Sequence, residues 1–384
     1  MARTWPKPPA GTRESVPLAP WTTLGIGGPA RWFLETGSPA QVEEGLSWAA
    51  ERRLPLFVLG GGSNLLIADE GFPGLVLRIA LRGIRHEPWN GAVMLEAAAG
   101  EDWDPIVEQA VSRGLAGVEC LSGIPGSAGA TPIQNVGAYG QEVSETIAAV
   151  EALARDGSGA RRFDAADCGF GYRDSVFKRE ERDRWVILRV AYRLQPGGAP
   201  AVRYGELAKR LEEEEGGEPD LPRVRRSVLA LRRAKGMVLD PDDPDTRSDG
   251  SFFMNPVIPA AALDAFLERV AAQGIDPATA PRFPARDRGV SPDGGGNRDG
   301  GVKLAAGWLI ERAGFRKGHR HGGVGISTKH ALAIVNRGAG TAAEALELVR
   351  EIRRRVEDRF GVLLHPEPSF VGFPGDPLAP GGDG

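Results

Sequence analysis

Apolar and polar residues follow two different periods in the first half of the chain. Short apolar runs broken by glycine predict strands at residues 56–59, 75–79 and 93–97. Residues 186–194 alternate apolar side chains with Arg189 and Arg193, which predicts a strand with one solvated face. Helical periods cover residues 42–52, where Ser38 and Gln41 give a capping signal, and residues 102–113. Strands and helices mixed in one region predict an α+β fold.

The second half of the chain is dominated by helical patterns. They predict helices at residues 224–233, 260–273, 302–313 and 341–358, and Thr341 and Glu344 form a capping box at the start of the last one. The acidic stretch 211–220 predicts a surface connection, and the glycine-rich stretch 283–301 predicts a loop. Because 384 residues exceed the size of one hydrophobic core, we expect more than one domain.

The composition is ordinary for a globular protein, with 41% hydrophobic and 26% charged residues and a formal net charge of −4. No apolar run reaches the roughly 20 residues of a membrane span, and the N-terminus lacks the apolar stretch of a signal peptide. We therefore expect a cytoplasmic protein. Cys120 and Cys168 are too few for a disulfide framework and are expected to be reduced thiols. A basic cluster at residues 223–235 could bind an anion or form a solvated helix face.

Two glycine-rich segments are candidates for ligand binding. Gly60, Gly61 and Gly62 follow an apolar run, so their amides could approach a phosphate closely, although a strand-end turn is the alternative. The run 124–140, IPGSAGATPIQNVGAYG, spaces its glycines among small residues and could lie along a flat ring or a pyrophosphate. A structural Ω-loop is the alternative for this run.

Three other patterns do not support a ligand site. Residues 25–30 formally fit a dinucleotide fingerprint, but no convincing strand precedes them and Pro29 lies inside the motif. No Gly-Lys pair is present to form a P-loop. His319, His321 and His330 lie near a run of basic residues that would repel a cation, so we expect no metal site.

Four segments, in this order, resemble the family of UDP-N-acetylenolpyruvoylglucosamine reductases: GGGSNL at 60–65, the run 124–140, GYRDS at 171–175 and GSFFMNPV at 250–257. The segments YGEL at 204–207, VKLAAGWLI at 302–310 and PEPSF at 366–370 extend the resemblance over residues 22–370. The tyrosine segment is similar to the first of the two main forms of this family, in which a tyrosine folds over the nucleotide.

The resemblance implies an FAD-binding module of the vanillyl-alcohol-oxidase (PCMH) type and a separate α+β substrate-binding domain. The module would occupy residues 20–205 as two subdomains that divide near residue 87, and residues 361–376 would complete it. The substrate-binding domain would occupy residues 223–358. Residues 1–19 and 377–384 are expected to be a loose leader and a loose tail.

The resemblance also implies an enzyme of peptidoglycan synthesis, and hence of cell wall biogenesis, cell shape, cell division and the cell cycle. The expected reaction is the NADPH-dependent reduction of UDP-N-acetylglucosamine enolpyruvate to UDP-N-acetylmuramate through non-covalently bound FAD. We expect a monomer without a metal and without a nucleic-acid or membrane partner.

Catalytic roles fall, by resemblance, on three residues. Arg173 would hold the substrate carboxylate, Ser251 would deliver a proton to C2, and Glu367 would act as a second acid or orient the substrate. Contacts to the uridine diphosphate would come from Tyr204, Lys235 and Asn255. The implied FAD-binding positions all lie in the two glycine-rich segments and are Gly60, Gly61, Gly62, Ser63, Asn64, Leu65, Gly126, Ser127, Gly129, Ala130, Gln134, Asn135, Gly137, Ala138 and Gly140.

Each catalytic assignment has a structural alternative: an ion pair of Arg173 with Asp174, a buried Ser251 hydroxyl, and a salt bridge of Glu367. Two other functions are a flavin oxidase of the same architecture acting on an alcohol or sugar, and a non-enzymatic nucleotide-binding module. Many such oxidases tether flavin through His or Cys, and no His occurs between residues 92 and 204. Met254 stands where many relatives have Lys, so a phosphate contact from that side chain is not expected.

Overall fold

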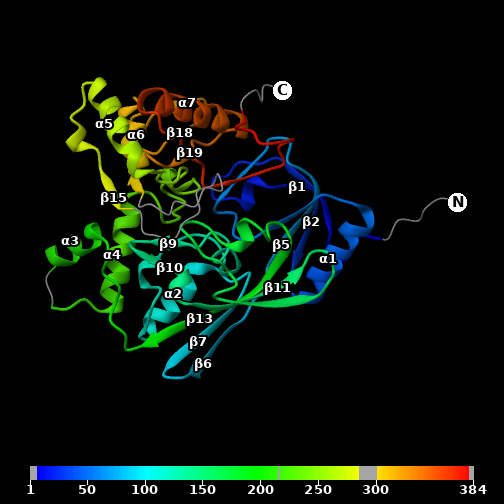
Figure 1. Ribbon diagram of the computed structural model, residues 1–384. Helices are drawn as coiled ribbons and strands as arrows, with labels where there is room; N and C mark the ends of the chain where they lie inside the picture. Colours follow the sequence, from blue (N-terminus) through cyan, green and yellow to red (C-terminus); the bar gives the residue numbers. More distant parts are fainter. Residues whose placement is uncertain (1–6, 215–216, 285–300, 380–384) are drawn as a thin grey trace. The chain divides into compact units, whose positions relative to one another are not determined.

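The structure is a computed structural model and describes residues 7–214, 217–284 and 301–379 (Figure 1). By its internal contacts the chain divides into two compact units. Unit 1 consists of Met1–Val16, Ala30–Gly62 and Pro73–Val238, and unit 2 consists of Pro17–Pro29, Ser63–Phe72 and Leu239–Gly384. The second unit thus includes two short segments from the first fifth of the chain. The predicted substrate-binding region, residues 223–358, divides between the two units.

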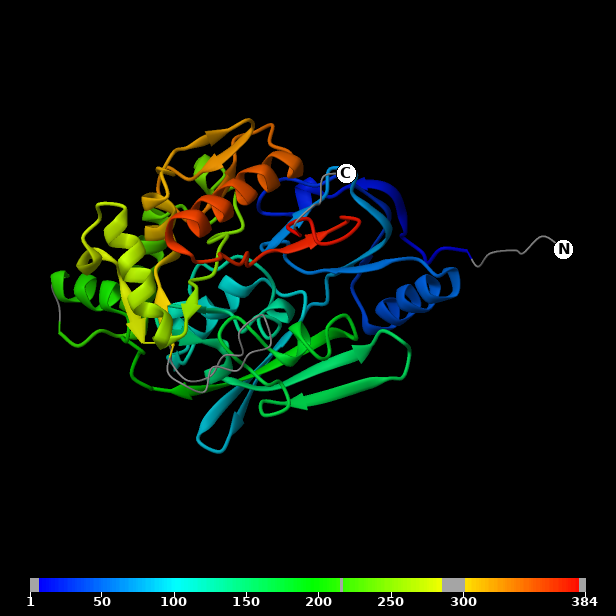
Figure 2. The ribbon, with the colours of Figure 1, turned by 45° about the horizontal axis from the view of Figure 1, so that its top comes forward.

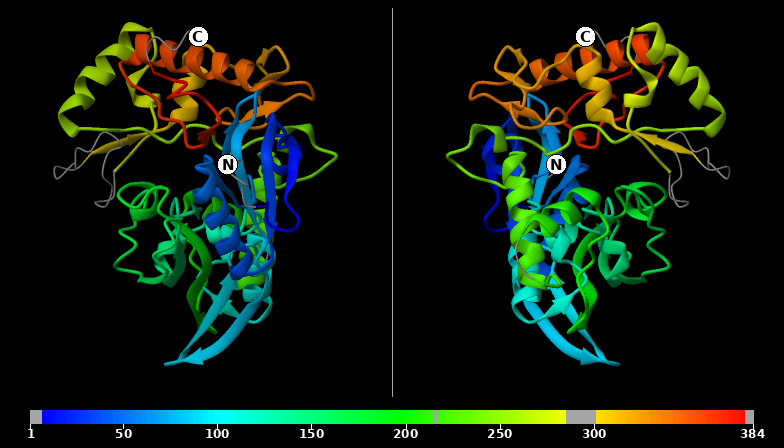
Figure 3. Two further views of the ribbon diagram at one scale, coloured as in Figure 1. Left: turned by 90° about the vertical axis from the view of Figure 1, so that its right-hand side faces the viewer. Right: turned by 90° about the vertical axis from the view of Figure 1, so that its left-hand side faces the viewer.

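Unit 1 contains two main sheets. The first has the strand order β1-β2-β5-β3, with bounds β1 Arg13–Pro17, β2 Pro29–Thr36, β5 Phe72–Ile79 and β3 Leu56–Leu59. The second has the order β12-β11-β13-β7-β6, with β8 paired to β13, and is antiparallel throughout. Its bounds are β12 Ala160–Asp164, β11 Ile147–Ala154, β13 Trp185–Pro196, β7 Ala92–Ala98, β6 Ile84–Trp89 and β8 Leu115–Ala116. Figure 3 shows the β6–β7 hairpin, in light blue, as a long projecting arm.

Four helices and a short hairpin complete unit 1: α1 Pro39–Arg52, α2 Trp103–Ser112, α3 Gly205–Glu213, α4 Leu221–Ala234, β9 Gly137–Ala138 and β10 Gln141–Glu142. The Ser38 side chain accepts a hydrogen bond from the Gln41 amide at the start of α1, as the capping signal predicts. Helices α1 and α2 bury one apolar face each, and both contribute to the same hydrophobic core as strands β5, β7, β11 and β13. Strand β3, which precedes the first glycine-rich segment, and Leu121, which precedes the second, both pack in this core.

Unit 2 is built from three small sheets and three helices. Strands β4 Leu65–Ile67 and β20 Ser369–Val371 are parallel, and the other two sheets have the orders β14-β16-β15 and β17-β18-β19. The remaining bounds are β14 Val257–Ile258, β16 Val302–Leu304, β15 Arg282–Pro284, β17 Arg320–His321, β18 Val324–Ile326, β19 Ile334–Asn336, α5 Leu263–Ala272, α6 Ala306–Arg312 and α7 Ala342–Phe360. Figure 2 shows α7, in orange-red, beside the orange strands, of which it contacts β17 and β18.

The N-terminus of α7 is capped twice. Thr341 and Glu344 form the predicted capping box, and the Asp69 carboxylate accepts hydrogen bonds from the amides of Ala342 (2.8 Å) and Ala343 (2.9 Å). The helix ends at Gly361, which adopts the left-handed conformation typical of a helix C-terminus. The prediction of a helix at 341–358 is confirmed, and Asp69 adds a contact from a distant part of the chain.

The other strands and helices predicted in the first half are confirmed within one to three residues by β3, β5, β7, β13, α1 and α2. Residues 224–233 form most of α4, and residues 260–273 contain a short 3-10 turn followed by α5. The run 25–30 leads into strand β2 and not into a helix, which agrees with the rejection of a dinucleotide fingerprint. The boundary between two subdomains that is expected near residue 87 lies inside strand β6. The connection between the two sheets of unit 1 comes earlier, at residues 80–83.

Two predictions about the second half need correction. A helix over 302–313 is wrong at its start, because residues 302–304 form strand β16 between β14 and β15, and α6 begins only at Ala306. The acidic stretch 211–220 is not only a connection, because α3 extends to Glu213 and buries Leu207 and Leu211 on one face. Most of the predicted loop 283–301 lies outside the described residues.

The predicted loose ends are partly ordered. Residues 13–17 form strand β1 beside β2, with the Arg13 guanidinium 4.9 Å from the centre of the Phe33 ring, and Leu18 is fully buried. At the other end, the guanidinium groups of Arg350 and Arg353 donate to the carbonyls of Pro377 and Leu378. Within the described ranges, no helix has the length and apolar character needed to cross a bilayer.

Candidate active site

The two glycine-rich segments of unit 1 lie against each other. A Cβ atom on Gly61 would be 2.5 Å from the Gly126 Cα atom, and one on Gly60 would be 2.8 Å from the Ser127 hydroxyl. Real Cβ atoms do not approach so closely, so backbone packs directly on backbone here. Gly126 also has a φ of +122°, which other residues rarely adopt. The structure therefore brings together two segments that the sequence singled out separately.

The first part of the run 124–140 is anchored on the sheet behind it. The amide of Ala128 donates to the Glu101 carbonyl (2.8 Å), and the amide of Gly129 donates to the Ala99 carbonyl (2.9 Å). A Cβ atom on Gly129 would lie 2.6 Å from the Ala99 Cβ atom. Close packing against Ala99 is therefore enough to explain why a glycine occupies position 129. For this part of the run, the observation agrees with the Ω-loop alternative.

Arg173 lies beside the second part of the same run. Its Nη2 atom donates to the Gly137 carbonyl at 2.7 Å, and its Nη1 atom lies 3.4 Å from the Asn135 carbonyl. The neighbouring Asp174 pairs with Arg179, so it has a guanidinium partner other than Arg173. The charged group of Arg173 is therefore fixed next to predicted FAD-binding positions.

Backbone strain is concentrated around Arg173. Asn135, Tyr139 and Arg173 have φ angles of +45°, +49° and +55°, and all three lie in predicted site segments. The buried Asn135 side chain stabilises this geometry, because its Nδ2 atom donates to the Gly171 carbonyl (2.8 Å) and to Glu142 (2.9 Å) while its oxygen accepts from the Ser144 amide. The predicted position Asn135 thus connects the two chain segments that hold Arg173.

Two predicted substrate-binding residues, Tyr204 and Lys235, converge on Tyr139 in unit 1. The rings of Tyr139 and Tyr204 meet edge to face at a centroid distance of 5.6 Å, and the Lys235 ammonium lies 5.7 Å from the Tyr139 ring centre. Lys235 is also paired with Glu206. Tyr204 is 47% exposed, so it can contact a ligand from solvent.

Most of the basic cluster at residues 223–235 is used inside unit 1. Arg225 forms a two-pronged pair with Asp104 at 2.6 and 3.0 Å, and Arg223 and Arg232 donate to backbone carbonyls. Burial opposes ionisation of Asp104, but the hydrogen bonds from Arg225 and the Gly123 amide, together with the charges of Arg225 and Arg232, hold the pKa of Asp104 below its ordinary value. Helix α4 is therefore tied to α2, and Lys235 at its end is placed by that contact.

In unit 2 the Ser251 segment pairs with the Glu367 segment. The Phe252 carbonyl accepts from the Glu367 amide (2.8 Å), and the Met254 amide donates to the His365 carbonyl (3.0 Å). Phe252 and Phe253 are fully buried in the core of unit 2. The octapeptide predicted to carry the proton donor is thus held by apolar anchors on one side and by a neighbouring chain segment on the other.

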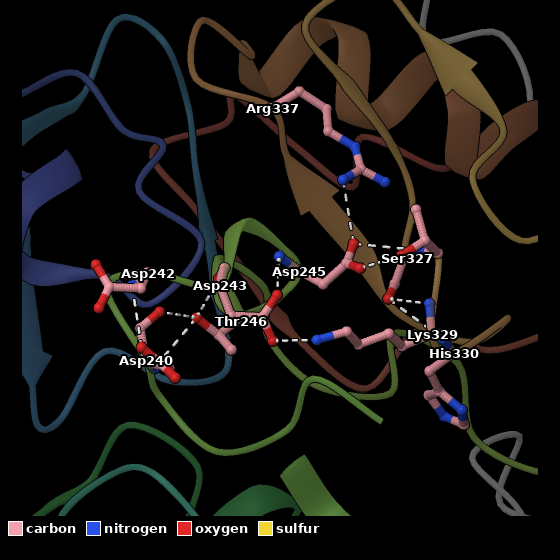
Figure 4. Close-up of polar contacts among 10 residues, drawn as sticks. Asp240, Asp242, Asp243, Asp245, Thr246, Ser327, Lys329, His330 and Arg337 are labelled. Atoms are coloured by element: carbon pink, nitrogen blue, oxygen red, sulfur yellow. Dashed lines mark hydrogen bonds and ion pairs between the residues drawn. The ribbon is translucent and has the colours of Figure 1, made fainter. Parts of the chain in front are cut away.

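The hydroxyl of Ser251 has a histidine next to it. Its oxygen lies 3.3 Å from the Nε2 atom of His330, and the residue as a whole is partly exposed. His330 belongs to a loop, residues 327–330, that is fastened by Asp245 (Figure 4). The Asp245 carboxylate accepts from the Thr328 amide and hydroxyl and pairs with Arg337 at 3.1 Å.

The charge of Asp245 is stabilised by these contacts. Burial alone would raise its pKa, but the hydrogen bonds from Thr328 and the charge of Arg337 hold the pKa of Asp245 below its ordinary value. The neighbouring Asp243 pairs with Lys329 on the same loop (Figure 4). The acidic run 240–245 therefore positions the histidine loop.

The remaining predicted positions of unit 2 surround the same segment. Asn64 donates from its side chain to the Glu367 carbonyl (3.1 Å), and Leu65 begins strand β4, which pairs with β20 just after Glu367. The oxygen of the Asn255 side chain accepts from the Ala306 amide at the start of α6, which directs the amide nitrogen away from that helix. Arg173, Tyr204 and Lys235 belong to unit 1, whereas Ser251, Asn255 and Glu367 belong to unit 2.

Comparisons with known proteins cover nearly the whole chain. Residues 30–161 match the model of an FAD binding domain, and residues 242–371 match the C-terminal domain of UDP-N-acetylenolpyruvoylglucosamine reductase. The chain is 50% identical to the UDP-N-acetylenolpyruvoylglucosamine reductase of Saccharopolyspora erythraea, over 92% of this chain and 94% of that protein. It is 47% identical to the reductase of the same name from Thermobifida fusca, over 94% and 98% of the two chains.

The chain belongs to the UDP-N-acetylenolpyruvoylglucosamine reductase family. A crystal structure of the reductase from Thermus caldophilus has the same fold, with a TM-score of 0.61 at 27% identity over 94% of this chain and 99% of that one. The expected α+β fold class, with an FAD-binding module and a separate C-terminal domain, is confirmed.

The residues of this reductase-family chain fit a bound FAD. Gly60 and Gly61 pack so closely on Gly126 and Ser127 that side chains at positions 60 and 61 are excluded, and such bare backbone can approach a pyrophosphate. Both segments lie within the matched FAD binding domain. Burial raises the pKa of the Cys120 and Cys168 thiols to about 12, so neither is a reactive group for attaching flavin covalently.

The histidines considered for a metal have other contacts. His321 lies 3.1 Å from a Glu347 oxygen, and His319 packs edge-on against Phe315. Among the described residues, no group of three or more His, Cys, Asp and Glu side chains is arranged to hold a metal ion.

Several site residues could not be found from local sequence. In the sequence, Tyr139 is only one member of a glycine-rich run, whereas in the structure its ring contacts both Tyr204 and Lys235. His330 was considered only as a metal ligand, and its contact with Ser251 links positions 79 residues apart. No local pattern signals a contact across such a distance.

Proposed function

We propose that the protein reduces the enolpyruvyl group of UDP-N-acetylglucosamine enolpyruvate to give UDP-N-acetylmuramate, a precursor of peptidoglycan, with NADPH as the electron donor. Membership of the reductase family supports this reaction. The observation that carries it is the pairing of the Ser251 segment with the Glu367 segment, which places a hydroxyl-bearing and a carboxyl-bearing residue on adjacent chain segments.

FAD, when bound, supplies the hydride chemistry by accepting two electrons from NADPH and passing a hydride to C3 of the enolpyruvyl ether. The predicted FAD-binding positions in segments 60–65 and 126–140 would hold it. Their backbone leaves room for close approach, and Asn135 keeps the second segment in its strained form. Noncovalent binding agrees with the buried, unreactive thiols.

Arg173 would bind the carboxylate of the substrate. Hydride addition at C3 moves electron density onto C2 and into that carboxylate, so negative charge grows next to the group that binds it. A planar guanidinium suits this carboxylate because it can donate two parallel hydrogen bonds. The contact of Nη2 with the Gly137 carbonyl orients the guanidinium before substrate arrives.

Ser251 would supply the proton that completes the reaction at C2. A hydroxyl is a weak acid, but a carbanion-like carbon is a strong base, so transfer is feasible when the two atoms are held in place. His330, 3.3 Å from the hydroxyl oxygen, limits the orientations that the Ser251 side chain can adopt. Glu367 would orient the substrate or act as a second acid.

The uridine diphosphate would contact Tyr204, Lys235 and Asn255. Tyr204 offers a half-exposed ring, Lys235 a positive charge and Asn255 an amide nitrogen. Because Lys235 is already paired with Glu206, a diphosphate would have to compete with that carboxylate or share the lysine with it. We also propose that the protein acts as a monomer in the cytoplasm, and sedimentation of the purified protein would test the first of these statements.

An anaerobic experiment tests the reaction. The purified protein is reduced with NADPH, substrate is added, and the flavin absorbance is followed with analysis of the product. Prompt reoxidation with formation of UDP-N-acetylmuramate is expected. A protein that is reoxidised only by oxygen would instead be an oxidase, and a colourless protein unable to take up FAD would refute both assignments.

A further inference from the structure

Asp249 is a buried carboxyl group two residues before Ser251. Its side chain accepts a hydrogen bond from the Leu65 amide, and its Oδ1 atom lies 3.5 Å from the Thr23 hydroxyl. The other oxygen, Oδ2, is buried and has no hydrogen-bond partner among the residues that the structure describes. All these residues belong to unit 2. A negative charge at this position would be poorly compensated.

The Thr23 hydroxyl is only a weak partner for an ionised Asp249. That hydroxyl has a single hydrogen, and it donates this hydrogen to the Ser248 carbonyl at 2.7 Å. Its contact with the Asp249 Oδ1 atom is long, at 3.5 Å, and competes for the same hydrogen. Thr23 therefore compensates a negative charge on Asp249 only weakly.

The surroundings of Asp249 supply no charge that would favour ionisation. Burial raises the pKa of Asp249 to about 8, against the smaller opposite effects of the Leu65 amide and the Thr23 hydroxyl. No charged side chain of the described residues contributes to this shift. In the preceding acidic run, Asp245 pairs with Arg337 and Asp243 pairs with Lys329.

We propose that Asp249 is a positioning residue whose protonated carboxyl group ties Thr23 and Leu65 to the turn that carries Ser251, and that its ionisation loosens this turn. The proposal rests on the proposed function, because Ser251 is there the proton donor. Leu65 is a predicted cofactor-binding position, so the same carboxyl group connects that segment to the serine. Gly250, with a φ of +74°, is the flexible link between Asp249 and Ser251.

The first test compares the wild type with Asp249→Asn over a pH range of about two units on either side of 8. Asparagine has the same shape, can donate to Thr23 and accept from Leu65, and cannot ionise. The rate of flavin reoxidation by substrate in the wild type should fall about tenfold for each pH unit above the midpoint, whereas the variant should stay level. Flavin reduction by NADPH serves as the control, because Ser251 takes no part in it.

Three results would overturn the proposal. The first is an identical pH profile in the two proteins. The second is an equal loss of both half-reactions at every pH, which indicates a merely structural residue. The third is an asparagine variant that does not fold, because the neutral side chain should replace the protonated carboxyl group without loss.

A second test does not depend on activity. In the unfolded chain an aspartate ionises near pH 4, so between about pH 4 and about pH 8 the folded wild type binds the extra proton and loses stability as pH rises. The melting temperature of Asp249→Asn should exceed that of the wild type at pH 8, and the gap should close toward pH 5. A gap that does not change with pH would refute the protonated state. This outcome is separate from the function, since an inactive wild type would still show the expected melting behaviour.

Discussion

Arg173 in unit 1 and Ser251 in unit 2 are held in place by different kinds of interaction. The Arg173 region is fixed by hydrogen bonds: the buried Asn135 side chain has three partners, and Asn135, Tyr139 and Arg173 all have left-handed backbone. The Ser251 region is fixed by burial, because Phe252 and Phe253 insert into the core of unit 2. Directional hydrogen bonds can hold a strained backbone, whereas apolar anchors hold a strand without fixing each polar atom. This contrast predicts different responses to mutation.

The largest effect is expected from removal of an apolar anchor. Phe253→Ala should lower the free energy of unfolding by about 3–5 kcal/mol, because a fully buried ring leaves a cavity. Denaturant titration measures this loss, and Phe253→Leu, which fills part of the space, should lose much less. Equal losses in the two variants would show that the ring is not an anchor.

The second prediction concerns catalysis. Arg173→Ala should raise the activation barrier by roughly 3–4 kcal/mol, a loss of about two to three orders of magnitude in turnover, because one preorganised donor to the growing charge is removed. FAD should remain bound, which the visible spectrum reports. Arg173→Lys keeps the charge but not the planar fork and should recover only part of the rate. Turnover like that of the wild type in Arg173→Ala would remove this residue from the mechanism.

A third prediction separates strain from hydrogen bonding at Asn135. Asn135→Ala should lower the free energy of unfolding by roughly 2–3 kcal/mol, because buried partners are left unsatisfied and alanine disfavours a positive φ. Asn135→Gly loses the same hydrogen bonds but tolerates the backbone, so it should be more stable than the alanine variant by about 1 kcal/mol. Thermal unfolding compares the two, and the opposite order would contradict the strain argument.

The smallest effect on stability is expected at Ser251 itself. Its hydroxyl has one long contact, to His330, so Ser251→Ala should change the free energy of unfolding by about 1 kcal/mol or less. The same variant should slow reoxidation by substrate roughly 10²–10⁴-fold while flavin reduction by NADPH is unchanged. Stopped-flow absorbance measures both steps, and equal reoxidation rates would refute the role of Ser251 as proton donor.

The sequence predicted those features that depend on local signals. The capping box at Thr341 acts through adjacent residues, so the sequence predicts the start of α7, whereas the packing of Gly61 on Gly126 joins distant positions. Strand β16 was mistaken for a helix, because residues 302–304 are extended only by pairing with β14 and β15. The contacts of Tyr139, His330 and Asp249 are also long-range, and no spacing rule in one sequence reveals them. The catalytic assignments came from a resemblance and stay predictions.

The parallel pairing of β4 with β20 has a consequence for how the protein is made. Residues 65–67 leave the ribosome about 300 residues before residues 369–371, their partners in unit 2. Asp69 likewise precedes the start of α7, which its carboxylate caps, by almost as many residues. Strand β4 can therefore pair with β20 only after residues 369–371 have been synthesised. A ribosome stalled a few codons before residue 369 would hold a nascent chain in which unit 1 has all of its segments and unit 2 does not.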